Sequence, residues 1–126
     1  MTKMDPVLVT NSAMWAGWGT LTMAAPKKAA KIYFNMDAPS KETVGITRWV
    51  GWGYIAQAGS MLLIDKYGDD KLKKSAKTLQ AVANGVGIAQ IWYQTEKNGY
   101  DKTQAVVSTA VMGGVMAANI ADVVKE

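Results

Sequence analysis

The stretch from Pro6 to Pro26, PVLVTNSAMWAGWGTLTMAAP, contains no charged residue. It is 21 residues long, and a helix needs about 20 largely apolar residues to cross the hydrocarbon core of a membrane. Proline is accepted in the first turn of a helix, and a second proline marks where that helix ends. We therefore expect a membrane-spanning helix over about residues 7–25.

Three further runs without charge follow, at residues 49–64, 78–95 and 103–121. The first of them is long enough to span if it begins at Val44, because the side chain of Arg48 can reach the membrane surface from near a helix end. The pattern predicts one all-α domain over residues 1–126. It is an integral membrane bundle of four transmembrane helices with short loops, at about residues 7–25, 44–64, 78–94 and 103–124.

The alternative fold is a soluble four-helix bundle with an alanine-rich core. The uncharged runs are rich in Ala, Gly, Thr, Ser, Asn and Gln, so each would insert only modestly well. A soluble bundle, however, needs a polar face with Lys and Glu at helical spacing on every helix. Residues 6–26 and 103–121 offer no charged residue for such a face, which favours the membrane fold.

The segments between the runs carry nearly all the charge. Residues 27–36 place apolar and basic residues at helical spacing, which indicates a short interfacial helix, although a solvated connector fits as well. Residues 65–77 read as a charged loop whose lysines begin the next helix. The turn at residues 96–102 has Asn98-Gly99 at its centre, and its shortness predicts that the flanking helices lie antiparallel.

The chain contains no cysteine and no histidine. It therefore has no thiolate nucleophile or thiolate metal site, and it lacks the commonest metal ligand and the commonest general base. These absences predict a protein that is not an enzyme, with no catalytic residues and no metal site. The lysine-rich loops suit anionic lipid headgroups, and no nucleic-acid motif accompanies them.

Small residues repeat every four positions on two of the expected helices, a spacing that marks contact faces between membrane helices. We expect these residues to lie at helix interfaces, within the bundle or against another subunit: Ser12, Ala16, Thr20, Ala24, Thr109, Gly113, Ala117 and Ala121. The pattern W-x-G-W-G also occurs twice, at residues 15–19 and 49–53. The recurrence is explained either by an inverted repeat or by chance similarity.

Amide side chains are the polar groups within the expected spans. Their usual role is to form hydrogen bonds between helices, and a side-chain oxygen can also ligate the metal of a pigment ring. The candidate cofactor-binding or packing residues are Gln57, Asn84, Gln90 and Asn119. No cofactor is required, and chlorophyll, carotenoid or lipid are the candidate ligands.

Short loops, small-residue faces and the absence of catalytic chemistry predict a non-catalytic accessory subunit of a large membrane complex, photosynthetic or respiratory. Its expected partners are other membrane subunits and lipids. A thylakoid or mitochondrial inner membrane is favoured, with a bacterial inner membrane as the alternative. Lys and Arg divide seven to seven between the two expected sides, so the positive-inside rule gives no orientation.

The alternative function is a small transporter. Four short spans with balanced flanking charge resemble the small multidrug exporters that insert in dual topology. That family needs a membrane-embedded Glu in its first helix, and residues 7–25 contain no acidic residue. The departure puts proton-coupled export in doubt.

Overall fold

The computed structural model describes residues 4–125, and this part of the chain is all-helical. Its helices are α1 (Pro6–Ala24), α2 (Pro26–Phe34), α3 (Lys41–Tyr67), α4 (Asp70–Lys97) and α5 (Lys102–Lys125). The predicted all-α class is confirmed. Lys3, which the orientation count includes, lies outside the described residues.

Short polar residues set the helix boundaries. The carboxylate of Asp5 accepts hydrogen bonds from the first amides of α1, and Ser40 and Asp69 begin α3 and α4 in the same way; such caps satisfy amide groups that have no partner within the helix. Asn35 ends α2 in the left-handed conformation, with φ of 56°. Gly99, with φ of +74°, turns the chain between α4 and α5.

The sequence interpretation made the loop between the second and third long helices too long. It assigned residues 65–77 to a charged loop, whereas α3 continues to Tyr67 and α4 begins at Asp70. Lysine is a good helix former, and Asp69 caps the new helix by accepting a hydrogen bond from the Leu72 amide at 2.8 Å. The connection therefore consists of Gly68 and Asp69 alone.

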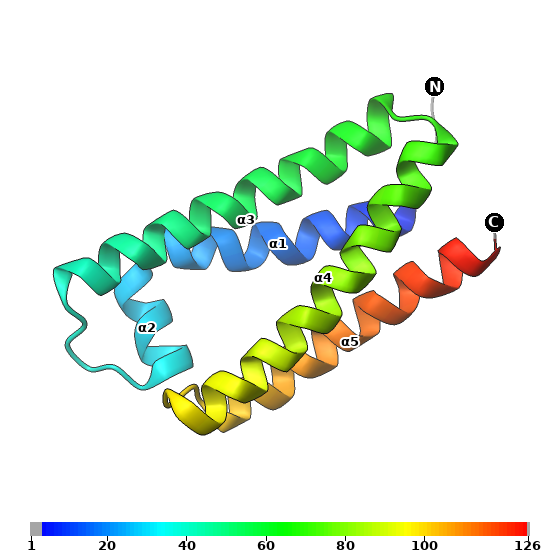
Figure 1. The fold of residues 1–126 in the computed structure, drawn as a ribbon. Helices are drawn as coiled ribbons and strands as arrows, with labels where there is room; N and C mark the ends of the chain where they lie inside the picture. Colours follow the sequence, from blue (N-terminus) through cyan, green and yellow to red (C-terminus); the bar gives the residue numbers. More distant parts are fainter. Residues whose placement is uncertain (1–3, 126) are drawn as a thin grey trace.

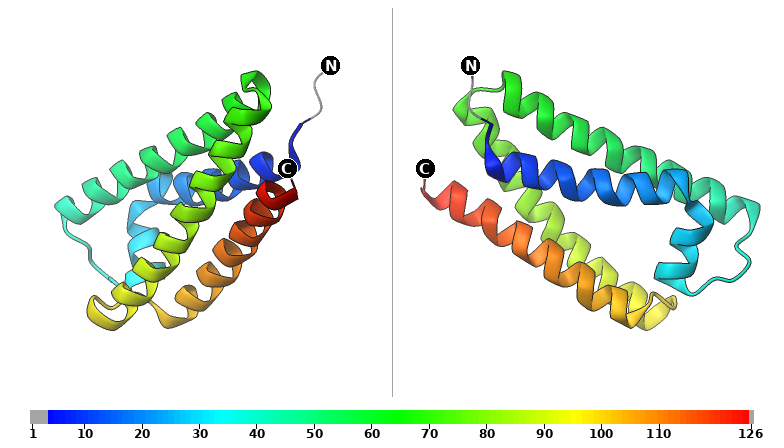
Figure 2. Two further views of the ribbon diagram at one scale, coloured as in Figure 1. Left: turned by 45° about the vertical axis from the view of Figure 1, so that its right-hand side comes forward. Right: turned by 180° about the vertical axis from the view of Figure 1, so that it is seen from behind.

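The long helices form two antiparallel pairs, α1 with α3 and α4 with α5. Figures 1 and 2 show that the pairs meet at one end, near both termini, and diverge toward the other. Helix α2 lies between the two pairs at the diverging end (Figure 1). The resulting arrangement is a wedge, with α2 across its open side.

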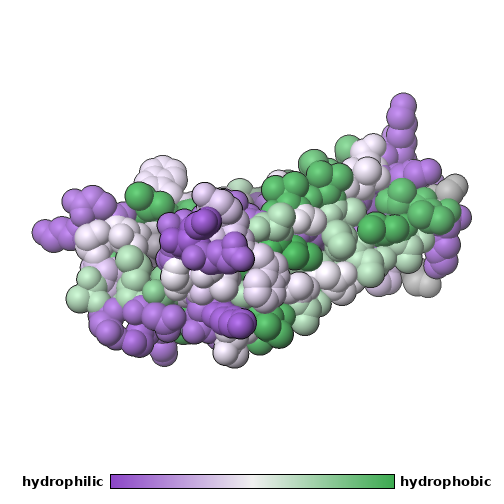
Figure 3. Space-filling model, turned by 60° about the horizontal axis from the view of Figure 1, so that its bottom comes forward, coloured by the Kyte–Doolittle hydropathy of each residue, from purple (hydrophilic) through white to green (hydrophobic). Residues whose placement is uncertain are grey.

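The interior of the wedge is unusually polar. Among the described residues, five large hydrophobic side chains are buried (Leu8, Trp15, Met61, Met112 and Val115), whereas 21 are exposed. The largest fully buried side chains, with less than 2 % exposure, are Lys77, Leu8, Gln80, Asn11, Asn84 and Asn119. Figure 3 shows patches of hydrophobic residues on part of one face and hydrophilic residues toward both ends.

Helix α5, over Lys102–Lys125, is the one helix in the described part of the chain that is long and apolar enough to cross a membrane. Four spanning helices were expected, and this criterion supports one of them. Helices α3 and α4 carry charged residues near their ends, and α4 also contains the buried Lys77, Gln80 and Asn84.

Candidate functional site: the wedge cavity and the charged end

A cavity of about 640 Å³ occupies the space where the two helix pairs diverge, within the 300–1,000 Å³ range of small-molecule sites. Helices α1 to α5 and the α4–α5 turn all contribute to its wall, so the cavity depends on the whole fold. We call it the wedge cavity. Its lining residues are Trp15, Trp18, Thr22, Ala29, Ala30, Tyr33, Phe34, Met36, Thr43, Ile46, Thr47, Val50, Tyr54, Gly87, Gln90, Ile91, Gln94, Asn98, Tyr100, Ser108 and Met112.

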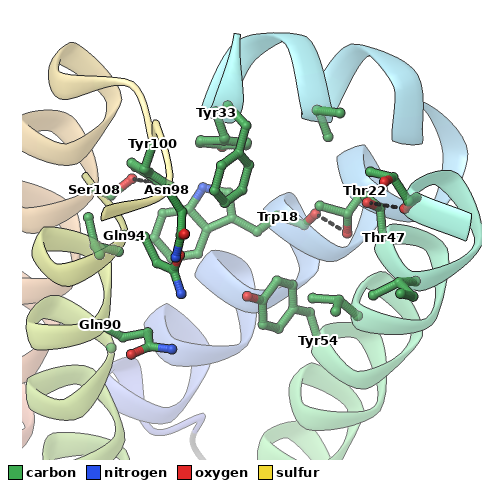
Figure 4. Close-up of a pocket in the computed structure, with 18 of the residues that line it drawn as sticks. Trp18, Thr22, Tyr33, Thr47, Tyr54, Gln90, Gln94, Asn98, Tyr100 and Ser108 are labelled. Atoms are coloured by element: carbon green, nitrogen blue, oxygen red, sulfur yellow. Dashed lines mark hydrogen bonds between the residues drawn. The ribbon is translucent and has the colours of Figure 1, made fainter. Parts of the chain in front are cut away.

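Aromatic rings form two contacting groups in this wall. The Trp15 ring lies 5.1 Å from the Tyr54 ring and 6.1 Å from Trp18, while Tyr100 stacks at 5.7 Å on Tyr33. Figure 4 shows Trp18, Tyr33 and Tyr54 directed toward the same space. Burial raises the pKa of both Tyr33 and Tyr100, so their hydroxyls are neutral and can donate hydrogen bonds at physiological pH.

The polar groups of the wedge cavity are all neutral. Gln90, Gln94 and Asn98 project from one side of α4 and its C-terminal cap, as Figure 4 shows. The Tyr100 hydroxyl lies 3.4 Å from that of Ser108. Within residues 4–125, the Tyr54 hydroxyl has no hydrogen-bond partner. The cavity therefore offers donors and acceptors without a formal charge.

Helix α2 is fastened to the opposite helix pair at the end of the wedge cavity. The Asp101 amide donates to the Tyr33 carbonyl at 2.5 Å, and the Asn35 side chain donates to the Asp101 carboxylate at 3.3 Å. Asp101 also accepts from the Gln104 amide at 3.0 Å and so begins α5. The same residue therefore starts a helix and joins the two halves of the wedge.

The converging end of the wedge is held by charges. The buried ammonium of Lys77 lies 2.7 Å from the Asp5 carboxylate and 2.5 Å from that of Asp122. The Asp5 amide donates to the Asp65 carboxylate at 2.8 Å. Although burial by itself raises the pKa of Asp5, its hydrogen bonds with Lys77 and with the first α1 amides lower that pKa below the ordinary value of 3.8. Helices α1, α3, α4 and α5 are thereby joined at one end.

Amide pairs continue from the charged end toward the wedge cavity. Asn11 and Asn119 exchange two hydrogen bonds between α1 and α5. The Gln80 oxygen accepts from the Trp15 indole at 2.8 Å and from Gln57 at 3.2 Å. One turn further along α4, Asn84 is fully buried, and both of its amide atoms are without a partner among the described residues.

The structure separates the four predicted polar site residues. Gln90 lines the wedge cavity, whereas Gln57 and Asn119 form hydrogen bonds between helices. Asn84 lies in the interior, and neither atom of its side-chain amide has a hydrogen-bond partner among the described residues. Of the four, Asn84 and Asn119 are buried, Gln57 is half-buried and Gln90 is exposed at the cavity.

The small residues predicted to lie at helix interfaces also fall into two groups, one inside the bundle and one facing outward. The Ser12 hydroxyl donates to the Ala58 carbonyl at 2.9 Å, and Ala16 packs against the cluster around Trp15, so these two lie inside the bundle. Thr109 accepts a hydrogen bond from the Trp92 indole, and Gly113 is half-buried with open space on its side-chain side. The outward-facing members are Thr20, Ala24, Ala117 and Ala121.

Sequence reasoning missed the closest helix contact and the buried lysine. A Cβ atom added at Gly51 would lie 2.6 Å from the Met23 amide nitrogen, and one at Gly19 would lie 3.0 Å from the Gly51 carbonyl. Both glycines belong to the W-x-G-W-G repeats, so the repeats meet where α1 crosses α3. The signal for Lys77 was its spacing from Gln80 and Asn84, which places all three on one face of α4.

No group of three or more His, Cys, Asp or Glu side chains in residues 4–125 is arranged to hold a metal ion. Comparison of the chain with protein-family models, with curated proteins and with solved structures gives no match.

Proposed function

We propose that this chain is an integral membrane protein of four spanning helices that serves as a non-catalytic accessory subunit of a larger membrane complex. The observation that carries the membrane part is the inverted distribution of polarity. Fully buried side chains include Lys77, Gln80 and Asn119, while Leu63, Val86 and Val106 are at least half exposed. A lipid environment favours apolar exteriors and satisfied polar groups within the bundle.

Helix length supports the same proposal. The four long helices have 19, 27, 28 and 24 residues, and a rise of about 1.5 Å per residue makes even the shortest about 29 Å long. A typical hydrocarbon core is about 30 Å thick. Helix α2, with its lysines and its position at one end, suits the interface between headgroups and lipid tails.

The subunit role is supported by the outward-facing small residues. Thr20 and Ala24 on α1 and Ala117 and Ala121 on α5 are exposed, and small side chains allow a neighbouring helix to approach closely. Other membrane subunits and lipids are the partners that suit these faces. A thylakoid or mitochondrial inner membrane remains the favoured location.

A small transporter is the second candidate, and one observation favours it. Lys77 is paired with two carboxylates inside the bundle, and ionisable residues within membrane helices often mark transport pathways. The same pairs also fasten four helices at the converging end, a structural role that needs no transport.

Native gel electrophoresis of source membranes in mild detergent tests the subunit role. We expect the chain to migrate in a band far larger than its own mass of 13.6 kDa. Migration of all the protein as a monomer or dimer contradicts the accessory role and favours the transporter. The visible spectrum of the large band, with chlorophyll bands or with haem bands, distinguishes a photosynthetic partner from a respiratory one.

A further inference from the structure

We infer that the wedge cavity binds a neutral, planar amphiphile, a quinone-type ring that carries an apolar tail. The inference goes beyond the proposed membrane role: the ring is argued from the lining of the cavity alone, and only the path of the tail rests on that role. It commits to a ring with carbonyl oxygens, for four reasons that concern charge, shape, hydrogen bonding and access.

Charge excludes ionic ligands. None of the described side chains that line the wedge cavity is charged, so an anion would lose its hydration without gaining an opposite charge, and a cation would gain only the faces of aromatic rings. Burying an unpaired charge costs far more than a neutral ligand of the same size. The occupant is therefore neutral.

Shape favours a flat ring. Trp15, Trp18 and Tyr54 form one aromatic group of the wall, and Tyr33, Phe34 and Tyr100 form the other. Aromatic faces gain most from another π-system at stacking or edge-to-face distance. A conjugated ring fits these walls better than a saturated ring system does.

The unused hydrogen-bonding groups favour carbonyl oxygens. The hydroxyl of Tyr54 and the side-chain amide of Gln90 face the wedge cavity from opposite helix pairs (Figure 4), and neither has a partner among the described residues. Both groups can donate a hydrogen bond. A ring with two carbonyl groups on opposite sides offers an acceptor to each of them.

The rim of the wedge cavity is apolar and accessible. Ile46 and Val50 on α3 are 65 % and 42 % exposed, and Met36 beyond α2 is 39 % exposed. In a membrane these side chains would face lipid tails. A ligand of this kind would place its ring against the aromatic wall of the wedge cavity. Its apolar tail would pass Ile46 and Val50 and lie among lipid tails.

Menadione, a neutral naphthoquinone, is the probe, and quenching of tryptophan fluorescence is the readout. The full chain is used in detergent with the exposed Trp49, Trp52 and Trp92 replaced by Phe, which leaves Trp15 and Trp18 in the cavity wall. We expect saturable quenching by menadione. The anionic 1,4-naphthoquinone-2-sulfonate should bind at least tenfold more weakly.

Two pairs of variants locate the site. Tyr54→Phe should weaken menadione binding about three- to tenfold through one lost hydrogen bond, whereas Tyr67→Phe, on the outer surface of the same helix, should leave binding unchanged. Val50→Phe narrows the rim and should weaken binding more than Val86→Phe, an exposed valine away from the cavity. Circular dichroism melts of all four check that the fold is retained.

Quenching that rises linearly with the concentration of menadione and is equal in all variants overturns the inference. An affinity for the sulfonate equal to that for menadione overturns it as well. Saturable binding that Tyr54→Phe and Val50→Phe leave unchanged also overturns it, because the ligand then lies elsewhere. Failure of the membrane proposal has a different signature. The chain would be recovered without detergent, whatever its affinity for menadione.

Discussion

Asn11 on α1 and Asn119 on α5 donate hydrogen bonds to each other's side-chain oxygens, at 2.9 and 3.1 Å, and neither residue is accessible to solvent. Each amide also donates to a carbonyl of its own helix, Val7 for Asn11 and Val115 for Asn119. The pair is thus fully satisfied, and it joins the first helix to the last.

Replacing one member of this pair should be worse than replacing both. Asn11→Leu leaves the Asn119 amide buried without its partner, which should lower the free energy of unfolding by about 1–3 kcal/mol. The double variant Asn11→Leu/Asn119→Leu should recover part of that loss. Denaturant unfolding in mild detergent measures both effects, and a double variant as unstable as the sum of the single ones would contradict the pairing.

The second W-x-G-W-G repeat, at residues 49–53, offers a matched test of the α1–α3 contact. Gly51→Ala places a Cβ 2.6 Å from the Met23 amide nitrogen, whereas Gly53→Ala places one in open space. We expect Gly51→Ala to destabilise the fold by about 1–3 kcal/mol through overpacking. Gly53→Ala should be neutral or stabilising by up to about 1 kcal/mol, because alanine favours the helix. Equal effects would show that the helices do not approach closely at Gly51.

Lys77 should be far more sensitive to substitution than its exposed neighbours on α4. Lys77→Met leaves the Asp5 and Asp122 carboxylates without their buried counter-charge, and breaking a buried ion pair typically costs about 3–5 kcal/mol. Lys74→Met, at an exposed position, should change stability by less than about 0.5 kcal/mol. Thermal unfolding of the two variants side by side checks the difference.

Acid should weaken the converging end through Asp5. The pKa of its carboxyl is lower in the folded chain than the ordinary value of 3.8, so Asp5 stabilises the fold above that value. The contribution is lost as the pH falls through the folded pKa. Asp5→Asn keeps a helix-capping side chain but removes the titration. We expect the variant's unfolding free energy to change less than the wild type's below pH 3.8, and an identical pH dependence would contradict the assignment.

The sequence predicted the positions of the helices along the chain better than it predicted which helices pack against each other. Charge-free runs locate α1, α3, α4 and α5 because a helix signal is local, and Asn98-Gly99 locates the α4–α5 turn. The wedge cavity is not local. It requires Tyr54 and Gln90, 36 positions apart, to face each other, and a single sequence does not encode which helix faces which. The loop assigned to residues 65–77 also concealed Lys77, because lysine there looked like one more solvated charge.

Alkaline carbonate extraction of source membranes, followed by ultracentrifugation, tests the central claim most directly. An integral membrane bundle with a polar interior and an apolar exterior should stay in the membrane pellet and require detergent for release. Recovery of the chain in the carbonate supernatant, or in the soluble fraction before extraction, would contradict the membrane proposal.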